Sequence, residues 1–194
     1  MEPLFRLAKY DETDAILAMY RSAVGLPMCT WDEEYPGRLQ IDEDFRAGNL
    51  FVLLLGEQII GAISIVPQNE LNDAAQWEAK ENAAEFARVV IAPAYQGKGY
   101  SSLLVDEVLK EIQNRQFHAV HLSVAVVNTP AQRTYLKKGF QILERKELYG
   151  HCFYLCEKQL FPSSDYRTPD NGQSGLQQGE TSPLQPHHSR KMLP

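Results

Sequence analysis

Apolar and polar residues follow two different periods along this chain, and the two periods alternate. Runs of β-branched and apolar residues, or strict alternation of apolar with polar residues, are typical of strands. Apolar residues spaced by three or four positions are typical of helices that bury one face. We predict strands at residues 4–8, 51–55, 58–66, 89–91, 118–127, 141–148 and 151–158. We predict helices from Asp11 toward Val24, over residues 39–47, over residues 100–112, and from Asn128 to Gly139.

Turn and cap residues mark the ends of these elements. Asp11 is a favourable N-cap for the first helix, and Gly25 ends that helix. Gly56 opens a two-residue turn between two strand-like runs, which predicts a hairpin. Asn128 or Thr129 can cap the last helix. The order of the elements predicts an α/β domain with a mixed sheet.

The length of 194 residues suits one domain with a sizeable core. The periodic patterns stop near residue 160, so we expect a domain at residues 1–160 and a disordered tail, rich in proline, serine and glutamine, at residues 161–194. No apolar run reaches the roughly 18 residues of a membrane span, and no basic-then-apolar leader occurs at the N-terminus. The expected compartment is therefore the cytoplasm.

Charge and cysteine content narrow the classes of partner. The net charge of −6 argues against a nucleic-acid partner, because such binding is led by basic patches, and it favours a cationic acceptor. Cys29, Cys152 and Cys156 are too few and too scattered for a disulfide framework or a structural zinc site. We therefore expect no metal centre.

The stretch from Arg88 to Ile112 combines a strand, a glycine-containing turn and a long amphipathic helix. Glycines at the start of a helix let an anion approach the first helical amides, which have no partner within the helix. Such turns are common in α/β proteins, and many bind no anion. The pattern is neither the P-loop GxxxxGK[ST] nor GxGxxG, so it does not indicate a mononucleotide or dinucleotide site.

Two motifs make the interpretation more specific. The first has the form Q-x-x-G-x-[G/A] and consists of Gln96, Gly99 and Ser101, where the serine departs from the usual small residue. The second, N-x-x-A-x-x-x-Y followed by K-x-G-F, consists of Asn128, Ala131, Tyr135, Lys137, Gly139 and Phe140. In this order the two motifs resemble those of the GNAT superfamily of N-acetyltransferases.

The resemblance covers residues 4–160 and implies the GNAT fold. This is a mixed, largely antiparallel central sheet of six to seven strands with four helices, splayed between strands 4 and 5. The loop formed by Trp31, Tyr35 and Pro36 has the form W-x-x-x-Y-P, which is most like small bacterial members of the superfamily.

The mechanism that the resemblance implies is direct transfer from acetyl-CoA to an amine in a ternary complex. The pantetheine arm would pair with the strand, and the backbone N–H of Val89 would stabilise the oxyanion. Tyr135 would protonate the leaving thiolate, or would be only a core tyrosine; Asn128 would bond pantetheine, cap its helix, or do both. The residues implied to hold acetyl-CoA are Val89, Val90, Ile91, Gln96, Gly97, Lys98, Gly99, Tyr100, Ser101, Asn128, Ala131 and Tyr135.

Glu85 is the candidate base that would deprotonate the acceptor amine. It lies eleven residues before Gln96, which is the spacing in the histone-acetylating branch of the superfamily. Strand alternation places Glu85 on the same side as Val89 and Ile91. Two alternatives are a chain of waters as the base and a merely solvated strand end. Arg88, expected on the opposite face, would bind an acceptor carboxylate or pair with a loop acid.

The acceptor pocket is expected to include aromatic residues from two loops. Trp31 and Tyr35 lie among the acids Asp32, Glu33 and Glu34, which would give a lid a negative potential. The alternative is that the two aromatics plug the edge of the core. Trp77 likewise either packs on the core or borders a pocket.

The expected function is N-acetylation of a primary amine of a small molecule or peptide, by a monomer or homodimer without a metal. The alternative is a catalytically silent acyl-CoA-binding module. Tyr135 together with an intact loop from Gln96 to Ser101 favours the enzyme, since both are present.

Overall fold

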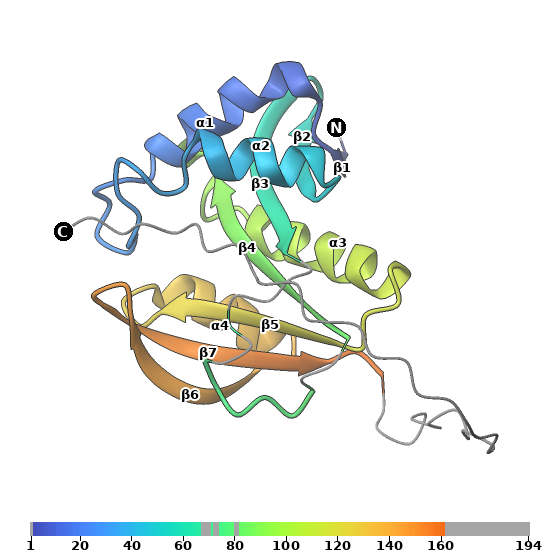
Figure 1. Ribbon diagram of the computed structural model, residues 1–194. Coiled ribbons are helices and arrows are strands. Elements are labelled where there is room, and N and C mark those ends of the chain that lie inside the picture. The colour runs from blue at the N-terminus through green and yellow to red at the C-terminus, as the bar shows by residue number, and fades with distance from the viewer. Residues whose placement is uncertain (1, 67–70, 72–73, 80–81, 162–194) are drawn as a thin grey trace, which may run out of the picture. The chain divides into compact units, whose positions relative to one another are not determined.

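A seven-stranded mixed sheet forms the centre of the described part of the chain (Figure 1). The computed structural model describes residues 2–66, 71, 74–79 and 82–161, and residues 1–162 form one compact unit. The tail expected at residues 161–194 therefore lies, apart from Phe161, outside the described residues. The strands are β1 (Pro3–Leu7), β2 (Leu50–Leu55), β3 (Gln58–Val66), β4 (Ala83–Ile91), β5 (Ala119–Ala125), β6 (Gln141–Leu148) and β7 (His151–Gln159).

The strand order is β1-β2-β3-β4-β5-β7-β6, and every neighbouring pair is antiparallel except β4 and β5. β2 and β3 form the hairpin predicted at Gly56, which has a φ of 64°. The parallel pair is joined over only three residues and ends at Glu85 opposite His121. Beyond that point β4 continues to Ile91 and β5 to Ala125, but the two strands no longer pair with each other. They diverge in Figure 1. The mixed sheet and its splay are therefore confirmed.

Two helices cover each face of the sheet. Within the described residues the α-helices are α1 (Thr13–Arg21), α2 (Arg38–Arg46), α3 (Tyr100–Asn114) and α4 (Thr129–Lys137), as expected in number. α1 and α2 lie together over β2, β3 and β4, while α3 and α4 lie on the other face (Figure 1).

Each helix layer closes its own apolar core. On the α3 and α4 side, Leu104 and Ile112 are fully buried against Ile60 and Leu122 of the sheet. On the α1 and α2 side, Ile16, Tyr20 and Ile41 pack on Val52 and its neighbours. The spacing of Leu104, Val108 and Ile112 is the four-residue repeat from which the helix is predicted, and all three side chains face the core.

The start of the first helix differs from the prediction. Asp11 does not cap it: a 3-10 turn (Tyr10–Glu12) precedes α1, which begins at Thr13. Glu12 holds this turn, because its carboxylate accepts from the Lys9 backbone N–H at 2.7 Å and from Arg6 Nη2 at 2.6 Å. An ion pair with a residue in β1 therefore sets where the chain turns, and no local cap signal contains that contact.

None of the helices in the described ranges is long and apolar enough to cross a membrane.

Candidate functional site

The turn between β4 and α3 has the geometry of an anion cradle. Gly97 and Gly99 adopt left-handed φ angles of 72° and 86°, and no atom lies within 4 Å of the space that a side chain would occupy at either position. Gly99 is the N-cap of α3, whose first turn contains Ser101. The first amides of α3 have no acceptor within the helix, and the helix dipole adds positive potential there. These residues fit a bound pyrophosphate.

Two side chains of the turn bind the turn itself. Gln96 Nε2 donates to the Ile91 carbonyl at 2.9 Å, so Gln96 holds the loop against the end of β4. Lys98 Nζ donates to the Ala94 carbonyl at 2.9 Å and lies 5.4 Å from the centre of the Tyr95 ring. Gln96 therefore shapes the cradle, and the Lys98 ammonium lies beside it.

A β-bulge interrupts β4 at the centre of the candidate site. Ala62 pairs with Val90 and Ser64 with Ala87, which leaves Arg88 and Val89 opposite the single residue Ile63. Arg88 has a φ of 55°, an unfavourable left-handed conformation for a residue with a side chain. Bulges re-aim the groups near them, so the Val89 amide leaves the regular ladder where β4 parts from β5.

The bulge makes the predicted position of Glu85 wrong. Phe86 and Ile91 both pack in the core under α3, although an uninterrupted strand would put them on opposite faces. Glu85 therefore lies on the face opposite Val89 and Ile91. It is also buried, with 8% of its surface exposed, so it is not a solvated strand end.

Arg88 pairs with an acid, but the acid comes from α2. Its guanidinium donates to both carboxylate oxygens of Asp44, at 2.8 and 2.7 Å, and to the hydroxyl of Tyr35 at 3.3 Å. Burial by itself would lower the pKa of Arg88, but Asp44 and Tyr35 raise it above the ordinary value. Arg88 thus lies on the α1 and α2 face, the same face as Glu85, which corrects the prediction of opposite faces.

The segment between α1 and α2 contains the predicted acceptor-side aromatics. Trp31 packs edge-on against Tyr20 of α1, with ring centres 5.4 Å apart, so it joins the edge of the core. Tyr35 is 37% exposed, and its hydroxyl accepts a hydrogen bond from Arg88. Asp32 accepts from the backbone N–H groups of Glu34 and Tyr35, both at 2.8 Å, so Asp32 shapes this loop.

α4 places Tyr135 beside β4. Tyr135 is buried, and its ring packs against Phe86 with centres 5.5 Å apart. Burial, and to a smaller extent Cys156, raise the pKa of Tyr135 above its ordinary value. Asn128 caps the helix, since its Oδ1 accepts from the Ala131 N–H at 3.2 Å, and Ala131 packs on the same core as Tyr135.

Two buried ionisable residues near the site were not among the predicted ones, and Trp77 packs on one of them. His121 and Glu157 lie on β5 and β7, and Trp77 stacks on His121 with ring centres 4.0 Å apart and planes at 12°. Trp77 is therefore a core residue, which decides between the two predicted alternatives of packing on the core and bordering a pocket. A histidine inside the apolar run of residues 118–127 was the available signal for a buried polar group.

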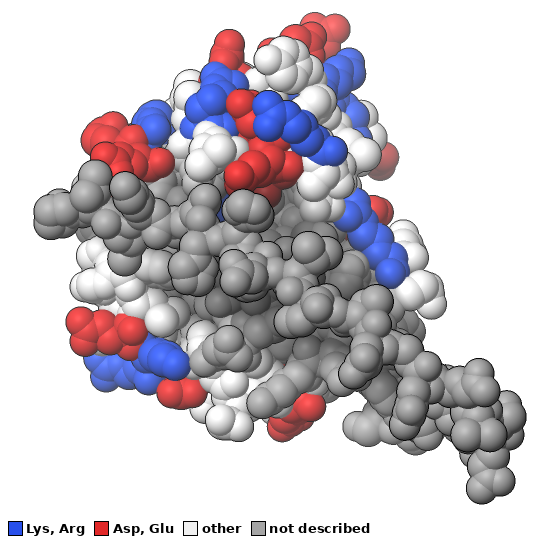
Figure 2. Space-filling model, viewed as in Figure 1, with Lys and Arg blue, Asp and Glu red and all other residues white. Residues whose placement is uncertain are grey.

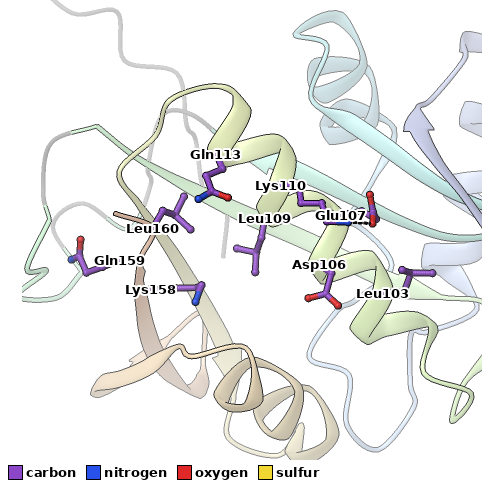
Figure 3. Close-up of a pocket in the computed structure, with 9 residues that line it drawn as sticks. All are labelled: Leu103, Asp106, Glu107, Leu109, Lys110, Gln113, Lys158, Gln159 and Leu160. Carbon is purple, nitrogen blue, oxygen red and sulfur yellow. Dashed lines mark hydrogen bonds and ion pairs between the residues drawn. The ribbon is translucent and has the colours of Figure 1, made fainter. Parts of the chain in front are cut away.

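A hollow of about 460 Å³ lies elsewhere, between α3 and the end of β7 (Figure 3). Several charged side chains that line it form ion pairs: Asp106 pairs with Lys138, and Glu107 pairs with Lys110. No predicted site residue lines this hollow, so it plays no part in the candidate site. Figure 2 shows acidic and basic side chains intermixed over α1 and α2 on the face in view.

The comparisons with known proteins agree with this geometry. A family model described as "Acetyltransferase (GNAT) family" matches residues 16–140. The solved structure of yncA from Salmonella typhimurium, which contains its cofactor acetyl-CoA, is 17% identical with a TM-score of 0.69; the match covers 89% of this chain and 100% of that one.

Two further structures share the fold. A GNAT-family acetyltransferase from Streptococcus agalactiae is 20% identical with a TM-score of 0.70, and the match covers 82% of this chain and 96% of that one. The ribosomal-protein-alanine N-acetyltransferase from Brucella melitensis is 21% identical with a TM-score of 0.63, covering 81% and 99%. A search of curated proteins found no match.

Proposed function

Because the chain belongs to the acetyltransferase (GNAT) family, we propose that it moves an acetyl group from acetyl-CoA to a primary amine of a small molecule or peptide. The transfer is direct, with both substrates bound together. The observation that carries the proposal is the combination of an anion cradle at Gly97 and Gly99 with a buried tyrosine, Tyr135, that packs on β4, the strand that leads into this cradle.

In this proposal acetyl-CoA binds to the cradle and to the edge of β4 that is not paired with β5. The amides from Gly97 to Ser101 hold the pyrophosphate, and the unpaired edge from Val89 to Ile91 offers backbone groups for a strand-like partner. When bound, acetyl-CoA supplies an acetyl group that is activated as a thioester. The re-aimed Val89 amide is the donor for negative charge on the acetyl oxygen.

Two side chains move protons in this proposal. The Tyr135 hydroxyl keeps its proton at neutral pH, because burial raises its pKa, and it is therefore suited to donate. Glu85 takes a proton from the acceptor ammonium on the α1 and α2 face. Tyr35 and the edge of Trp31 border that face, while Arg88 is occupied by Asp44 and positions Tyr35.

The decisive experiment combines binding with turnover. Acetyl-CoA binding is measured by calorimetry, and release of free CoA thiol is measured with polyamines, amino acids, aminoglycosides and N-terminal peptides. Thiol release that depends on one of these amines supports the proposal. Binding without release for any amine would instead support the catalytically silent acyl-CoA-binding module, and absence of binding would overturn both.

Replacing Gly99 with alanine should weaken acetyl-CoA binding about tenfold, because a left-handed alanine costs roughly 1–2 kcal/mol and the turn relaxes away from it. Calorimetry measures the change. Gly25→Ala is the matched control: Gly25 has a φ of 78° and open space around it, but lies beyond α1. Equal losses of affinity in the two variants would contradict a specific role for the cradle.

A further inference from the structure

Three buried ionisable side chains form one row across the sheet. In the strand register Glu85 of β4 is opposite His121 of β5, and His121 is opposite Glu157 of β7. Their exposed fractions are 8%, 0% and 3%. Directly opposed residues of neighbouring strands project from the same face of a sheet, so these side chains are neighbours.

The row lies at the point where the sheet opens. The pair Glu85 and His121 is the last rung of the parallel β4–β5 ladder. The neighbours at the two ends of the row, Val66 on β3 and Gln141 on β6, carry no charge. Arg88, the next charged residue of β4, is paired with Asp44. The Glu85 end of the row therefore adjoins the opening between the two strands.

His121 and Glu157 are held in one arrangement. His121 Nε2 lies 3.2 Å from Glu157 Oε2, and the imidazole stacks on Trp77. Glu157 accepts the backbone N–H groups of Glu78 at 3.0 Å and Ala79 at 3.2 Å. These contacts hold residues 77–79 against His121 and Glu157, whose exposed fractions are 0% and 3%.

Burial shifts the pKa values of His121 and Glu157 in opposite directions. Burial lowers the pKa of His121 to about 4, although a hydrogen bond with the Ala79 backbone opposes this. Burial also raises the pKa of Glu157, although the N–H groups of Ala79, Glu78 and Gln159 that donate to its carboxyl group oppose the rise. Both directions favour the uncharged forms of the two side chains.

We propose that His121 and Glu157 extend Glu85 into a row that accepts the proton lost by the acceptor ammonium. This inference rests on the proposed acetyl transfer. The ammonium nitrogen gives one proton to the Glu85 carboxylate and keeps the electron pair with which it attacks the thioester. The second proton of the amine leaves with the thiol, and the row later releases its proton to solvent. His121 and Glu157 are positioning residues that act through Glu85.

The first test needs no turnover. Carboxyl ¹³C and imidazole ¹⁵N NMR titrations of the full chain follow Glu157 and His121. We expect the pKa of Glu157 to lie above the usual carboxyl value. Glu85→Gln removes a neighbouring negative charge, so it should lower the pKa values of both groups by about one unit. Titrations of both groups that do not change in this variant would overturn the row, whatever the enzymatic activity.

The second test separates proton removal from structure with two matched acceptors. Benzylamine is an ammonium at neutral pH, whereas O-benzylhydroxylamine is already neutral. Glu85→Gln should lower kcat/KM for benzylamine about tenfold and for O-benzylhydroxylamine by less than about twofold. Glu157→Gln, which keeps the shape of the side chain, and His121→Asn should show the same selectivity, with defects that shrink as the pH rises.

Non-additivity is the sign that the three groups act together. The double variant Glu85→Gln/Glu157→Gln should be no slower with benzylamine than Glu85→Gln alone. Equal losses with both acceptors would show that His121 and Glu157 only support the fold, and would overturn the inference while leaving the acetyl transfer intact. If neither amine is a substrate, the NMR titrations decide.

Discussion

Replacing Tyr135 with phenylalanine should lower turnover about 100-fold, because loss of a positioned proton donor typically costs two to four orders of magnitude. The ring of phenylalanine fills the same space against Phe86, so the core should stay intact. Acetyl-CoA affinity should change by less than about threefold, since the hydroxyl is needed for proton transfer and not for holding the pyrophosphate. Steady-state kinetics and calorimetry on the same preparation measure the two quantities.

Tyr20→Phe is the matched control for this experiment. Tyr20 is also a buried helix tyrosine, but it packs in the core under α1 and α2, on the face of the sheet opposite Tyr135. It should retain normal turnover. A Tyr135→Phe variant that loses affinity and keeps turnover would make Tyr135 a structural residue.

Replacing Arg88 with alanine should lower the free energy of unfolding by about 3–5 kcal/mol, the typical cost of leaving a buried charge unpaired. Arg88 and Asp44 have side chains that are each only 11% exposed, and they are joined by two hydrogen bonds. Removing the guanidinium leaves the Asp44 carboxylate under α2 without its partner. Urea denaturation followed by circular dichroism measures the loss.

Two further variants test the cause. The double variant Arg88→Met/Asp44→Leu removes both charges and should recover most of the stability, because buried ion pairs are often no more stable than apolar pairs of similar size. Lys110→Ala breaks an exposed ion pair with Glu107 on α3 and should leave stability unchanged. A double variant as unstable as Arg88→Ala would mean that the charge of Asp44 is not the cause.

Parts of the candidate site could be predicted from the sequence alone. The Gly97 and Gly99 turn, the Asn128 cap and the Tyr135 position belong to segments whose conformation depends on neighbours a few residues away. The helix starts after the glycines as predicted, and Asn128 caps its helix as predicted. Whether these residues hold acetyl-CoA stays a prediction that the experiments above test.

The sequence could not predict on which face of the sheet each residue of β4 lies. Alternation counts residues along one strand, and it fails wherever a bulge adds a residue. The bulge at Arg88 depends on contacts with β3 and with Asp44, which is 44 residues away in sequence. Neither contact can be predicted from the pattern of apolar and polar residues within β4.

The sequence by itself determined the order of the elements, the glycine turn before α3 and the Asn128 cap of α4, because these depend on local periodicity and local turn chemistry. The tertiary structure decided three things: the pairing of Arg88 with Asp44, the face on which Glu85 lies, and the row that joins Glu85 to His121 and Glu157. The reason is that burial and cross-strand register bring together residues from distant segments. The long-range pairing of strands therefore assembles the candidate proton-accepting row.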